Sequence, residues 1–312
     1  MPKRPETVVG LEIRPLEVRL AELARAGRRV LATARLPLAP GRWLDAEHLS
    51  ATLRALIDGT LQGRPVRLAA SLPLGVANLR RVLAPAGPEA REHLAWDLET
   101  WLGEPLDGFA WDHAPLPAAV SGGTAHLVAS APRDVVRTVR DAVERATGQR
   151  LALLDVDAAA LPRLLPLNYP ENPSGKALLV HAHADVTAVM ETRAGEPVTV
   201  RVLREAEAAS DPDSGPQERA EGLLRLARAL GRMAADFMET EAARPAVLVG
   251  GALAVDPDFR ELLRAHVPAA TLLNPFRHLA GPDPAAHPEA YPGAPLAAVV
   301  ALALRADAED AA

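Results

Sequence analysis

The stretch VVGLEIRPLEVRLAEL, from Val8 to Leu23, reads as a strand, a tight turn and a returning strand. In many proteins a turn of this kind binds a nucleotide phosphate, and it then needs small residues whose backbone N–H groups can approach the anion. Here the turn contains Arg14 and Pro15. The stretch is therefore a working phosphate site, a degraded one, or a plain hairpin, and the rest of the chain has to decide.

The composition limits the classes of protein to consider. The chain has 312 residues, enough for two compact lobes or one large domain. Hydrophobic residues make up 49% and aromatic residues only 3%, which predicts a substantial core of Leu, Val and Ala. A net charge of −6 gives no electrostatic reason to expect a nucleic acid as partner. The absence of cysteine excludes disulfides, thiolate metal sites and cysteine nucleophiles.

Targeting signals are also missing from the sequence. The N-terminal residues lack the apolar segment and the small-residue cleavage site of a signal peptide. No run of about 18 apolar residues without charge occurs, so no transmembrane helix is predicted. The sequence therefore predicts a cytoplasmic protein.

Strand and helix patterns divide the first half into two parts. Residues 1–74 predict three strands, a helix and a fourth strand, which form the core of a first lobe. The helix begins after Asp45, its expected N-cap, and carries Leu49 and Leu53 at helical spacing. Residues 75–149 follow the order βαββα and predict a subdomain inserted in this first lobe.

The second half repeats the opening pattern of the first. Residues 150–175 predict a crossover strand and helix followed by a linker rich in Pro and Asn. A second lobe over 176–294 again begins with a strand hairpin, and the long helix 218–241 forms its smaller subdomain. Residues 295–312 predict a closing helix that returns to the first lobe. This internal repetition predicts an α/β fold with two β-rich lobes, the architecture of actin-like proteins.

Six stretches, in order along nearly the whole chain, carry a resemblance to a known family. They are VGLEIRPLEVRLAEL, LPLGVANLRRVLAP, AREHLAWDLETWLGEPLDGFAWDH, HLVASAPRDVVRTVRDAVERATGQRLALLDVDAAALPRLL, AVLVGGALAVDPDFRELLRAHV…LLNPF and PLAAVVALALR. In these stretches the chain resembles the PilM family of type IV pilus assembly proteins, actin-like relatives of the cell-division protein FtsA. The resemblance implies an actin-like (ASKHA, ribonuclease H-like) two-lobed fold with the FtsA/PilM-type inserted subdomain. It also implies an ATP site between the lobes.

The first phosphate turn departs from the family pattern. That pattern (Gly, Ile, Asp, Ile, Gly, Ser, Ser) falls on residues 10–16 of this chain. Gly10 is kept, and Glu12 retains a carboxylate one methylene longer than the Asp that would order metal-bound water. Arg14 and Pro15 replace Gly and Ser, and Pro15 removes one backbone N–H donor. Arg14 could neutralise a phosphate but cannot rebuild a nest of backbone donors, so the turn is predicted to be degraded.

The second phosphate turn has changed in the same direction. The family's Asp, Ile, Gly, Ala, Ser, Ser, Thr falls on residues 181–187. His181 replaces the acid, His183 replaces the Gly, and only Thr187 keeps a hydroxyl group. Asp185 brings a negative charge toward any phosphate. This turn is also predicted not to hold an anion.

The third nucleotide motif, a strand ending in a Gly pair, is kept at Gly250 and Gly251. The pair could admit an adenosine, although turn geometry explains it equally well. With two of three motifs lost, neither ATP nor Mg²⁺ is expected to bind, no catalytic residue is assigned, and the chain is not expected to be an enzyme. The vestigial ATP site implied by the resemblance consists of Gly10, Glu12, Arg14, His181, His183, Thr187, Gly250 and Gly251.

Other patterns have two readings each. His181 and His183 share a strand face and could bind a metal, but the sequence shows no third ligand, so no metal site is predicted. Asp155 and Asp157 also alternate on one face; they could act in acid–base chemistry, and a helix cap at Asp157 is the favoured reading. Trp101 falls on the apolar stripe of its helix and is predicted to lie in the core.

The resemblance implies an interaction protein of the type IV pilus inner-membrane machinery. A groove between the first lobe and its inserted subdomain would receive the N-terminal cytoplasmic peptide of a bitopic inner-membrane protein, PilN, so that membrane contact is indirect. The expected walls are strand 76–83, helix 89–102 and first-lobe strands. Two alternatives are an ATP-binding actin-like ATPase and a cytoplasmic component of type II secretion similar to GspL. Self-association and the biological outcome are left open by the sequence.

Overall fold

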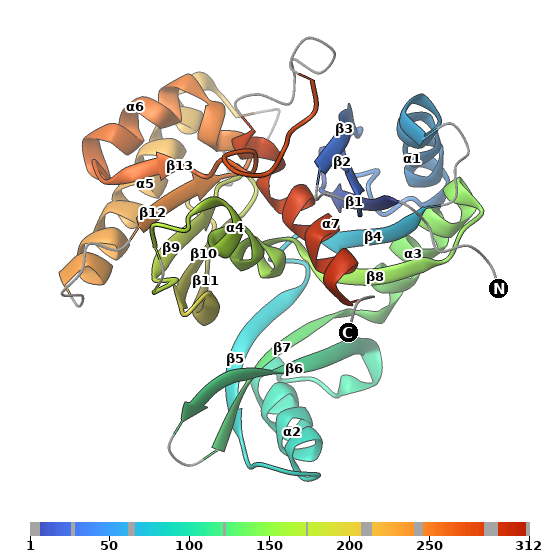
Figure 1. Cartoon of the computed structure of the whole chain (residues 1–312), viewed down its shortest axis with the longest axis horizontal. Helices are drawn as coiled ribbons and strands as arrows, with labels where there is room; N and C mark the ends of the chain where they lie inside the picture. The colour runs from blue at the N-terminus through green and yellow to red at the C-terminus, as the bar shows by residue number, and fades with distance from the viewer. Residues whose placement is uncertain are drawn as a thin grey trace.

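A computed structural model describes residues 7–25, 29–61, 66–120, 123–172, 174–206, 214–239, 246–283 and 293–309. Among these residues, no helix combines the length and the apolar character needed to cross a membrane. The described chain forms two lobes side by side, with a smaller body below them (Figure 1). The elements that make up each part explain where the candidate site lies.

The first lobe is built on a five-stranded sheet with strand order β3-β2-β1-β4-β8. Three antiparallel strands, β1 (Thr7–Ile13), β2 (Glu17–Ala24) and β3 (Arg29–Pro37), are followed by β4 (Arg67–Leu72) and β8 (Leu151–Val156), which run parallel to β1. All seven residues of β1 are buried, because helices or other strands cover both faces of this central strand.

The second lobe repeats the topology of the first strand by strand. Its sheet has the order β11-β10-β9-β12-β13, in which β9 (Ala177–His181), β10 (Thr187–Arg193) and β11 (Glu196–Leu203) are antiparallel and β12 (Ala246–Gly250) and β13 (Ala270–Leu272) are parallel to β9. Helix α5 (Pro216–Glu239) packs against α6 (Pro257–His266) in this lobe. The duplication places β1 and β9 at equivalent positions in the two sheets.

Helix α7 (Ala297–Glu309) lies at the junction of the lobes and packs against β1, β2 and β4 (Figure 1). Every residue from Ala297 to Leu304 is buried, as expected of a helix that is apolar all round. The helix approaches β1 closely because Gly10 has no side chain: a Cβ there would lie 2.5 Å from Val299 O. Gly10 therefore serves the packing of α7.

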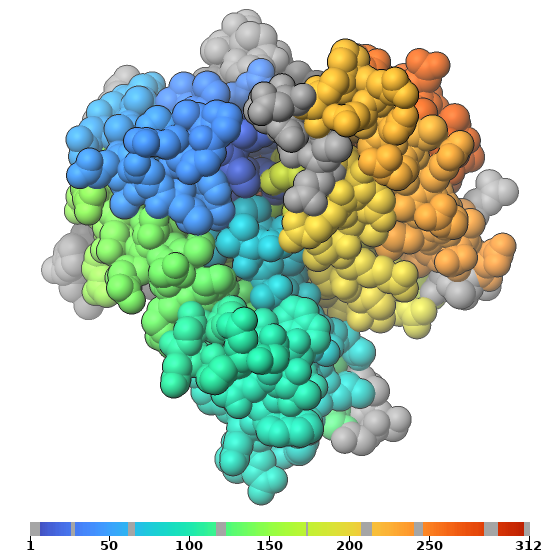
Figure 2. Space-filling view, turned by 180° about the vertical axis from the view of Figure 1, so that it is seen from behind, coloured from blue at the N-terminus to red at the C-terminus, as the bar shows by residue number. Residues whose placement is uncertain are grey.

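The body below the lobes is a three-stranded sheet with order β5-β7-β6, covered on one face by α2 (Ala90–Leu102). Its strands are β5 (Asn78–Ala84), β6 (Phe109–Val120) and β7 (Gly123–Pro132). It has a small core of its own, and it projects away from the junction of the two lobes when the molecule is seen from behind (Figure 2). That core consists of Val82, Ala84, Ala90, Leu94, Leu98 and Val128.

Two sequence-based expectations for this region were wrong. Helix α3 (Arg133–Thr147), predicted within the inserted subdomain, instead packs on α1 (Ala46–Leu61), and its buried face belongs to the first-lobe core. The reason is that its buried stripe of Val135, Val139 and Val143 fits against the helix of the larger lobe. Trp101 is 48% exposed and lies under the guanidinium of Arg80, 4.9 Å from the ring centroid. Leu94 and Leu98, and not its indole, fill the small core beneath α2.

Short helices complete the description. A 3₁₀ helix, η2 (Asp157–Leu164), follows β8 and leads into the single turn α4 (Leu165–Asn168); the sequence suggested one helix here, but Pro162 lies inside it. The others are η1 (Leu106–Gly108), η4 (Ala252–Val255) and η6 (Ala294–Leu296). Helix η2 packs against α7 and contacts β9 and β10, which places its first residue, Asp157, where the lobes meet, in a cleft that buried side chains fill.

Candidate functional site

The β1–β2 turn, where a phosphate would be held in the implied family, is closed on itself. The backbone N–H of Arg14 donates to Glu17 O at 2.9 Å, and Pro15 has no N–H to offer. The Arg14 side chain points into the protein and is only 3% exposed. The group that this turn directs toward the second lobe is therefore the guanidinium of Arg14. The turn presents no row of backbone N–H donors there.

Arg14 joins three separate parts of the chain. Its Nη1 forms a short ion pair with Asp157 Oδ2, and its Nη2 lies 2.7 Å from Asp185 Oδ1 on the second lobe. Asp157 Oδ1 also accepts hydrogen bonds from the backbone N–H groups of Leu74 at 3.1 Å and Ala158 at 2.7 Å. The predicted helix cap at Asp157 is wrong: Asp157 is the first residue of η2, Val156 occupies the cap position, and no side chain caps this helix.

Burial and charge act in opposite directions on this ion pair. Burial lowers the pKa of Arg14, but Asp185, Asp157 and Glu12 together raise it above its usual value. Burial also raises the pKa of Asp157, and the positive charge of Arg14 counteracts only part of that effect. The pair is thus held in a region that strongly disfavours isolated charges.

A second cluster lies beside the first and consists of Glu12, His181 and His183. His181 Nε2 is 3.0 Å from Glu12 Oε1 and 3.1 Å from His183 Nε2, and His183 Nε2 is 3.7 Å from Glu12 Oε1. Burial raises the pKa of Glu12, but Arg19, His181 and Arg14 outweigh burial and lower it to about 2. Burial, Arg14 and His181 keep the pKa of His183 well below its usual value. Glu12 is therefore ionised and His183 neutral near pH 7.

Arg19 holds the Glu12 carboxylate in place. Its Nη1 donates to Pro295 O at 2.6 Å and lies 3.4 Å from Glu12 Oε2, and its Nη2 forms a short ion pair with Glu17. With Oε2 facing Arg19, the other oxygen, Oε1, faces the two histidines. Sequence reasoning did not single out Arg19, and the strand EVRLAEL, which also carries Glu17 and Glu22, gives no clear signal that this arginine is buried.

The structure brings together five of the eight residues of the implied ATP site. Glu12, Arg14, His181 and His183 meet in the cleft, and Thr187 Oγ1 donates to the backbone oxygen of His183 at 3.1 Å. Asp157 and Asp185, which the sequence reading treated as a cap and as a repulsive charge, are the partners of Arg14. These side chains therefore contact one another where the two lobes meet.

The three glycines of the implied site pack against the protein itself. Gly10 lies under α7, as described above. A Cβ on Gly250 would lie 3.2 Å from Ala294 O, and one on Gly251, which has a φ of +92°, would lie 2.4 Å from Ala182 O. The Gly pair therefore permits a close turn of β12 against the end of β9, which explains it without a nucleotide.

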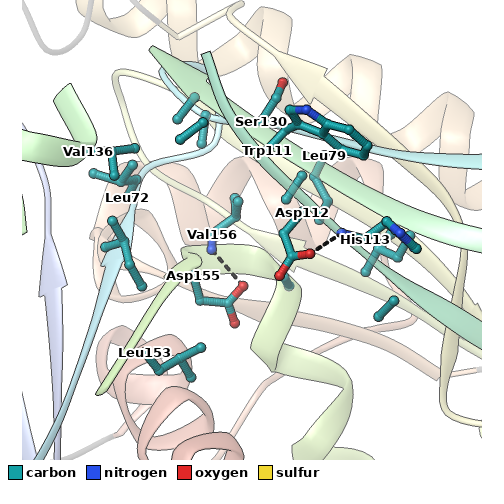
Figure 3. A pocket seen from close by; sticks show the side chains of 18 of the residues that line it. Leu72, Leu79, Trp111, Asp112, His113, Ser130, Val136, Leu153, Asp155 and Val156 are labelled. Carbon is teal, nitrogen blue, oxygen red and sulfur yellow. Dashed lines mark hydrogen bonds between the residues drawn. The ribbon is translucent and has the colours of Figure 1, made fainter. Parts of the chain in front are cut away.

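A groove of about 340 Å³ lies between the inserted subdomain and the first lobe (Figure 3). One wall consists of β6 and β7 residues, with Leu79 of β5 beside them, and the other of β8 residues and Arg305 of α7. Asp112 from β6 and Asp155 from β8 come from opposite walls and both point into it (Figure 3). Asp155 Oδ2 lies 2.6 Å from Arg305 Nη1. Helix 89–102, which the sequence reading expected as a wall, lines no part of this groove because α2 covers the opposite face of the sheet.

The groove continues toward the second lobe. A neighbouring hollow of about 770 Å³ shares Ala114, Leu127, Ala159 and Arg305 with it and extends to the β10–β11 turn at Ala194 and Gly195. Strand β6 runs along both, and in the part of the chain that the structure describes it pairs with β7 alone. One edge of β6 is therefore open toward the groove.

Comparisons with known proteins agree on the fold. No family model matches the sequence, and no curated protein matches it significantly. The structure is similar to that of a "PilM-PilN type IV pilus biogenesis complex", with a TM-score of 0.80 and 23% identity over 98% of this chain and 99% of that one. It also resembles the ethanolamine utilization protein EutJ from Carboxydothermus hydrogenoformans, with a TM-score of 0.53, 14% identity, and coverage of 97% and 91%.

A third similar structure names the fold directly. It is a Bacteroides thetaiotaomicron protein with an actin-like ATPase fold and unknown function, matched with a TM-score of 0.51 and 8% identity over 86% of this chain and 91% of that one. The actin-like fold predicted from the sequence is therefore confirmed, and the resemblance to PilM holds at the level of the fold.

Proposed function

We propose that this chain is a cytoplasmic scaffold of a type IV pilus assembly machinery, which binds the N-terminal cytoplasmic peptide of a bitopic inner-membrane protein similar to PilN. The observation that carries the proposal is the groove along β6. Over residues 109–114 its open strand edge offers backbone C=O and N–H groups, to which an extended peptide can add as a short further strand, whereas Pro115 and Pro117 have no N–H and the N–H of His113 is bonded to Asp112 Oδ1.

The lining of the groove suits a peptide with alternating apolar side chains. Leu72, Leu79, Leu127 and Val156 contribute apolar surface, and the carboxylate of Asp112 points into the groove beside them. An extended peptide presents every second side chain to the same face, so apolar side chains and one basic group can enter the groove together, with the basic group meeting Asp112. Membrane recruitment would then be indirect, through the partner's own span.

The cleft between the lobes supports a scaffold that does not use ATP. Arg14 neutralises two carboxylates, and the β1–β2 turn presents no row of backbone donors to a phosphate. We expect no binding of ATP with Mg²⁺ in isothermal titration calorimetry. ATP binding at micromolar affinity would favour the alternative of an actin-like ATPase.

The peptide proposal is tested with the N-terminal cytoplasmic segment of the small bitopic membrane protein encoded next to this chain, as a fluorescently labelled synthetic peptide. We expect saturable binding in fluorescence anisotropy and none with a scrambled peptide. Ala114→Trp, at an exposed position shared by both hollows, should weaken binding at least about tenfold, which corresponds to about 1.4 kcal/mol.

A matched control is available on the other edge of the same sheet. Leu83 on β5 is 48% exposed, and Leu83→Trp adds an indole of the same kind away from the groove. Binding that is equally affected by both variants would contradict the groove as the docking site, and absence of binding by the unmodified chain would contradict the proposed partner. If instead the chain binds the GspL-interacting components of a type II secretion system, the secretion alternative replaces the pilus one.

A further inference from the structure

Three potential metal ligands lie close together where the two lobes meet. Each of Glu12, His181 and His183 contributes one ligand atom. The ligating atoms, one carboxylate oxygen and two imidazole Nε2 atoms, form a triangle with sides of 3.0, 3.1 and 3.7 Å, about 3.3 Å on average. A tetrahedral zinc ion with ligands at about 2.0–2.1 Å holds its ligand atoms about 3.3–3.4 Å apart. The triangle thus has the dimensions of one face of a zinc tetrahedron.

Hydrogen bonds alone satisfy this triangle poorly. A neutral imidazole nitrogen carries either one proton or one lone pair, so His181 Nε2 makes one good hydrogen bond. It nevertheless faces both Glu12 Oε1 and His183 Nε2 at hydrogen-bond distance. His181 Nδ1 is buried and has no partner within the described residues. A cation bound to the three ligating atoms would accept a lone pair from His181 Nε2 and so remove the conflict there, although it would not reach Nδ1 on the other side of the ring.

The surrounding charges favour a divalent cation. Four carboxylates and two guanidinium groups form the network around the histidines, so the carboxylates outnumber the guanidinium groups by two. One divalent ion would bring the network to neutrality, and the buried position makes such compensation valuable. The members of the network are Glu12, Glu17, Asp157, Asp185, Arg14 and Arg19.

We propose that Glu12, His181 and His183 bind one transition-metal ion, with Zn²⁺ the best match to a His₂Glu ligand set, and that the ion links the two lobes. Glu12 lies on β1 of the first lobe, and the histidines lie at the end of β9 and just after it in the second. Three protein ligands leave a fourth position for water, and the Asp157 carboxylate, 3.6 Å from His181 Nε2, lies close by. The ion would occupy the cleft in place of a nucleotide, independently of the peptide groove.

The side chains that hold the ligands make the site rigid. Arg19 positions the Glu12 carboxylate, and the backbone of His181 is paired on both sides, with Ala188 of β10 and Gly250 of β12. All three ligands are at least 97% buried, so the ion must enter during folding or when the lobes separate. Binding should consequently stabilise the closed arrangement of the lobes.

The test uses the full chain, stripped with a chelator and titrated with Zn²⁺ against a chromophoric competitor. We expect one tightly bound ion per chain, a rise in thermal unfolding temperature with added Zn²⁺, and a tetrahedral absorption spectrum when Co²⁺ replaces it. His183→Gln should lower the Zn²⁺ affinity at least about a hundredfold, since loss of a ligand costs more than loss of a supporting contact. Glu12→Gln should weaken binding and keep the side-chain shape.

A second histidine pair supplies the control. His113 and His126 lie 3.2 Å apart in the inserted subdomain, and the described residues give them no third ligand. His126→Gln should leave the stoichiometry and affinity unchanged. The proposal is overturned if the folded unmodified chain binds no Zn²⁺, if the Co²⁺ spectrum is octahedral, or if His126→Gln removes the ion. Should His183→Gln fail to fold, the Co²⁺ spectrum and the Zn²⁺-induced thermal shift of the unmodified chain still decide.

Discussion

Arg14 Nη2 lies 2.7 Å from Asp185 Oδ1, so that a residue of the first-lobe hairpin turn is bonded to the equivalent turn of the second lobe. The same guanidinium is paired with Asp157, which is 2% exposed. Arg14 therefore connects the two lobes and η2 through the chain's own side chains.

Removing Arg14 should destabilise the protein strongly. Arg14→Met leaves Asp157 buried without its cation, and breaking a buried pair in this way costs about 3–5 kcal/mol. Urea titration should show that loss in the free energy of unfolding. Arg14→Met combined with Asp157→Asn should recover part of it, because the uncompensated charge is gone.

The control for Arg14 is an exposed ion pair. Arg140 Nη2 lies 3.0 Å from Asp141 Oδ1, and both side chains are exposed. Arg140→Met should change the free energy of unfolding by less than about 1 kcal/mol. Equal losses from the two variants would mean that burial of the Arg14 pair carries no energetic weight.

A substitution of Gly10 tests whether this residue is needed for the packing of α7 on β1. In Gly10→Ala the new Cβ would lie 2.5 Å from Val299 O and 3.2 Å from Ala303 N, so α7 has to move away from β1. Overpacking of this kind costs about 1–3 kcal/mol, measurable by thermal or urea unfolding. Gly59→Ala in α1 meets no atom within 4 Å and should be neutral or stabilising by up to about 1 kcal/mol. A neutral Gly10→Ala would refute the packing role.

The opening hairpin, the repetition of the two halves and the closing helix could be predicted from the sequence, because strand alternation, turn residues and helical spacing are local signals. The cleft could not. Glu12 and His181 are separated by 169 positions, and the two lobes meet through contacts of η2 with β9 and β10 and of η6 with α7 and β12, most of which join elements that are not neighbours in the sequence. For that reason His181 and His183 showed no third ligand in the sequence.

Local patterns also fail where one helix has two possible partners. The apolar stripe of α3 fits a helix in either body, and nothing within 133–147 shows that α1 is its partner. The same limit applies to Arg14, which the sequence analysis predicted to prevent formation of a phosphate nest. Its partners, Asp157 and Asp185, belong to other elements, and neither is marked as a partner by its own surroundings in the sequence.

Acid should weaken the inserted subdomain through His126. Its side chain is buried, and burial together with the nearby His113 lowers the pKa of His126 in the folded state. The unfolded chain, with an ordinary pKa near 6.5, then binds more protons at mildly acidic pH, so stability falls as the pH drops through 6.5. Urea unfolding at pH 7.5 and 5.5, followed by tryptophan fluorescence, should show this loss, and His126→Gln should reduce it. His93→Gln, at a half-buried position on α2, controls for removal of an imidazole and should leave the difference in place.

Leu98 and Trp101 lie on different faces of α2, one buried and one exposed, and their substitution should have different effects on stability. Leu98 is 2% exposed within the small core under this helix, so Leu98→Ala should cost about 2–5 kcal/mol in the free energy of unfolding. Trp101→Ala removes a larger side chain that is 48% exposed and contacts Arg80 at 4.9 Å, a cation–π contact of about 0.5–1 kcal/mol, so its cost should be closer to 1 kcal/mol. An indole is larger than a leucine side chain. If Trp101 were in the core, Trp101→Ala would therefore lower the free energy of unfolding more than Leu98→Ala. Urea titrations of the two single variants therefore decide between the faces, and a larger loss for Trp101→Ala would place its ring in the core.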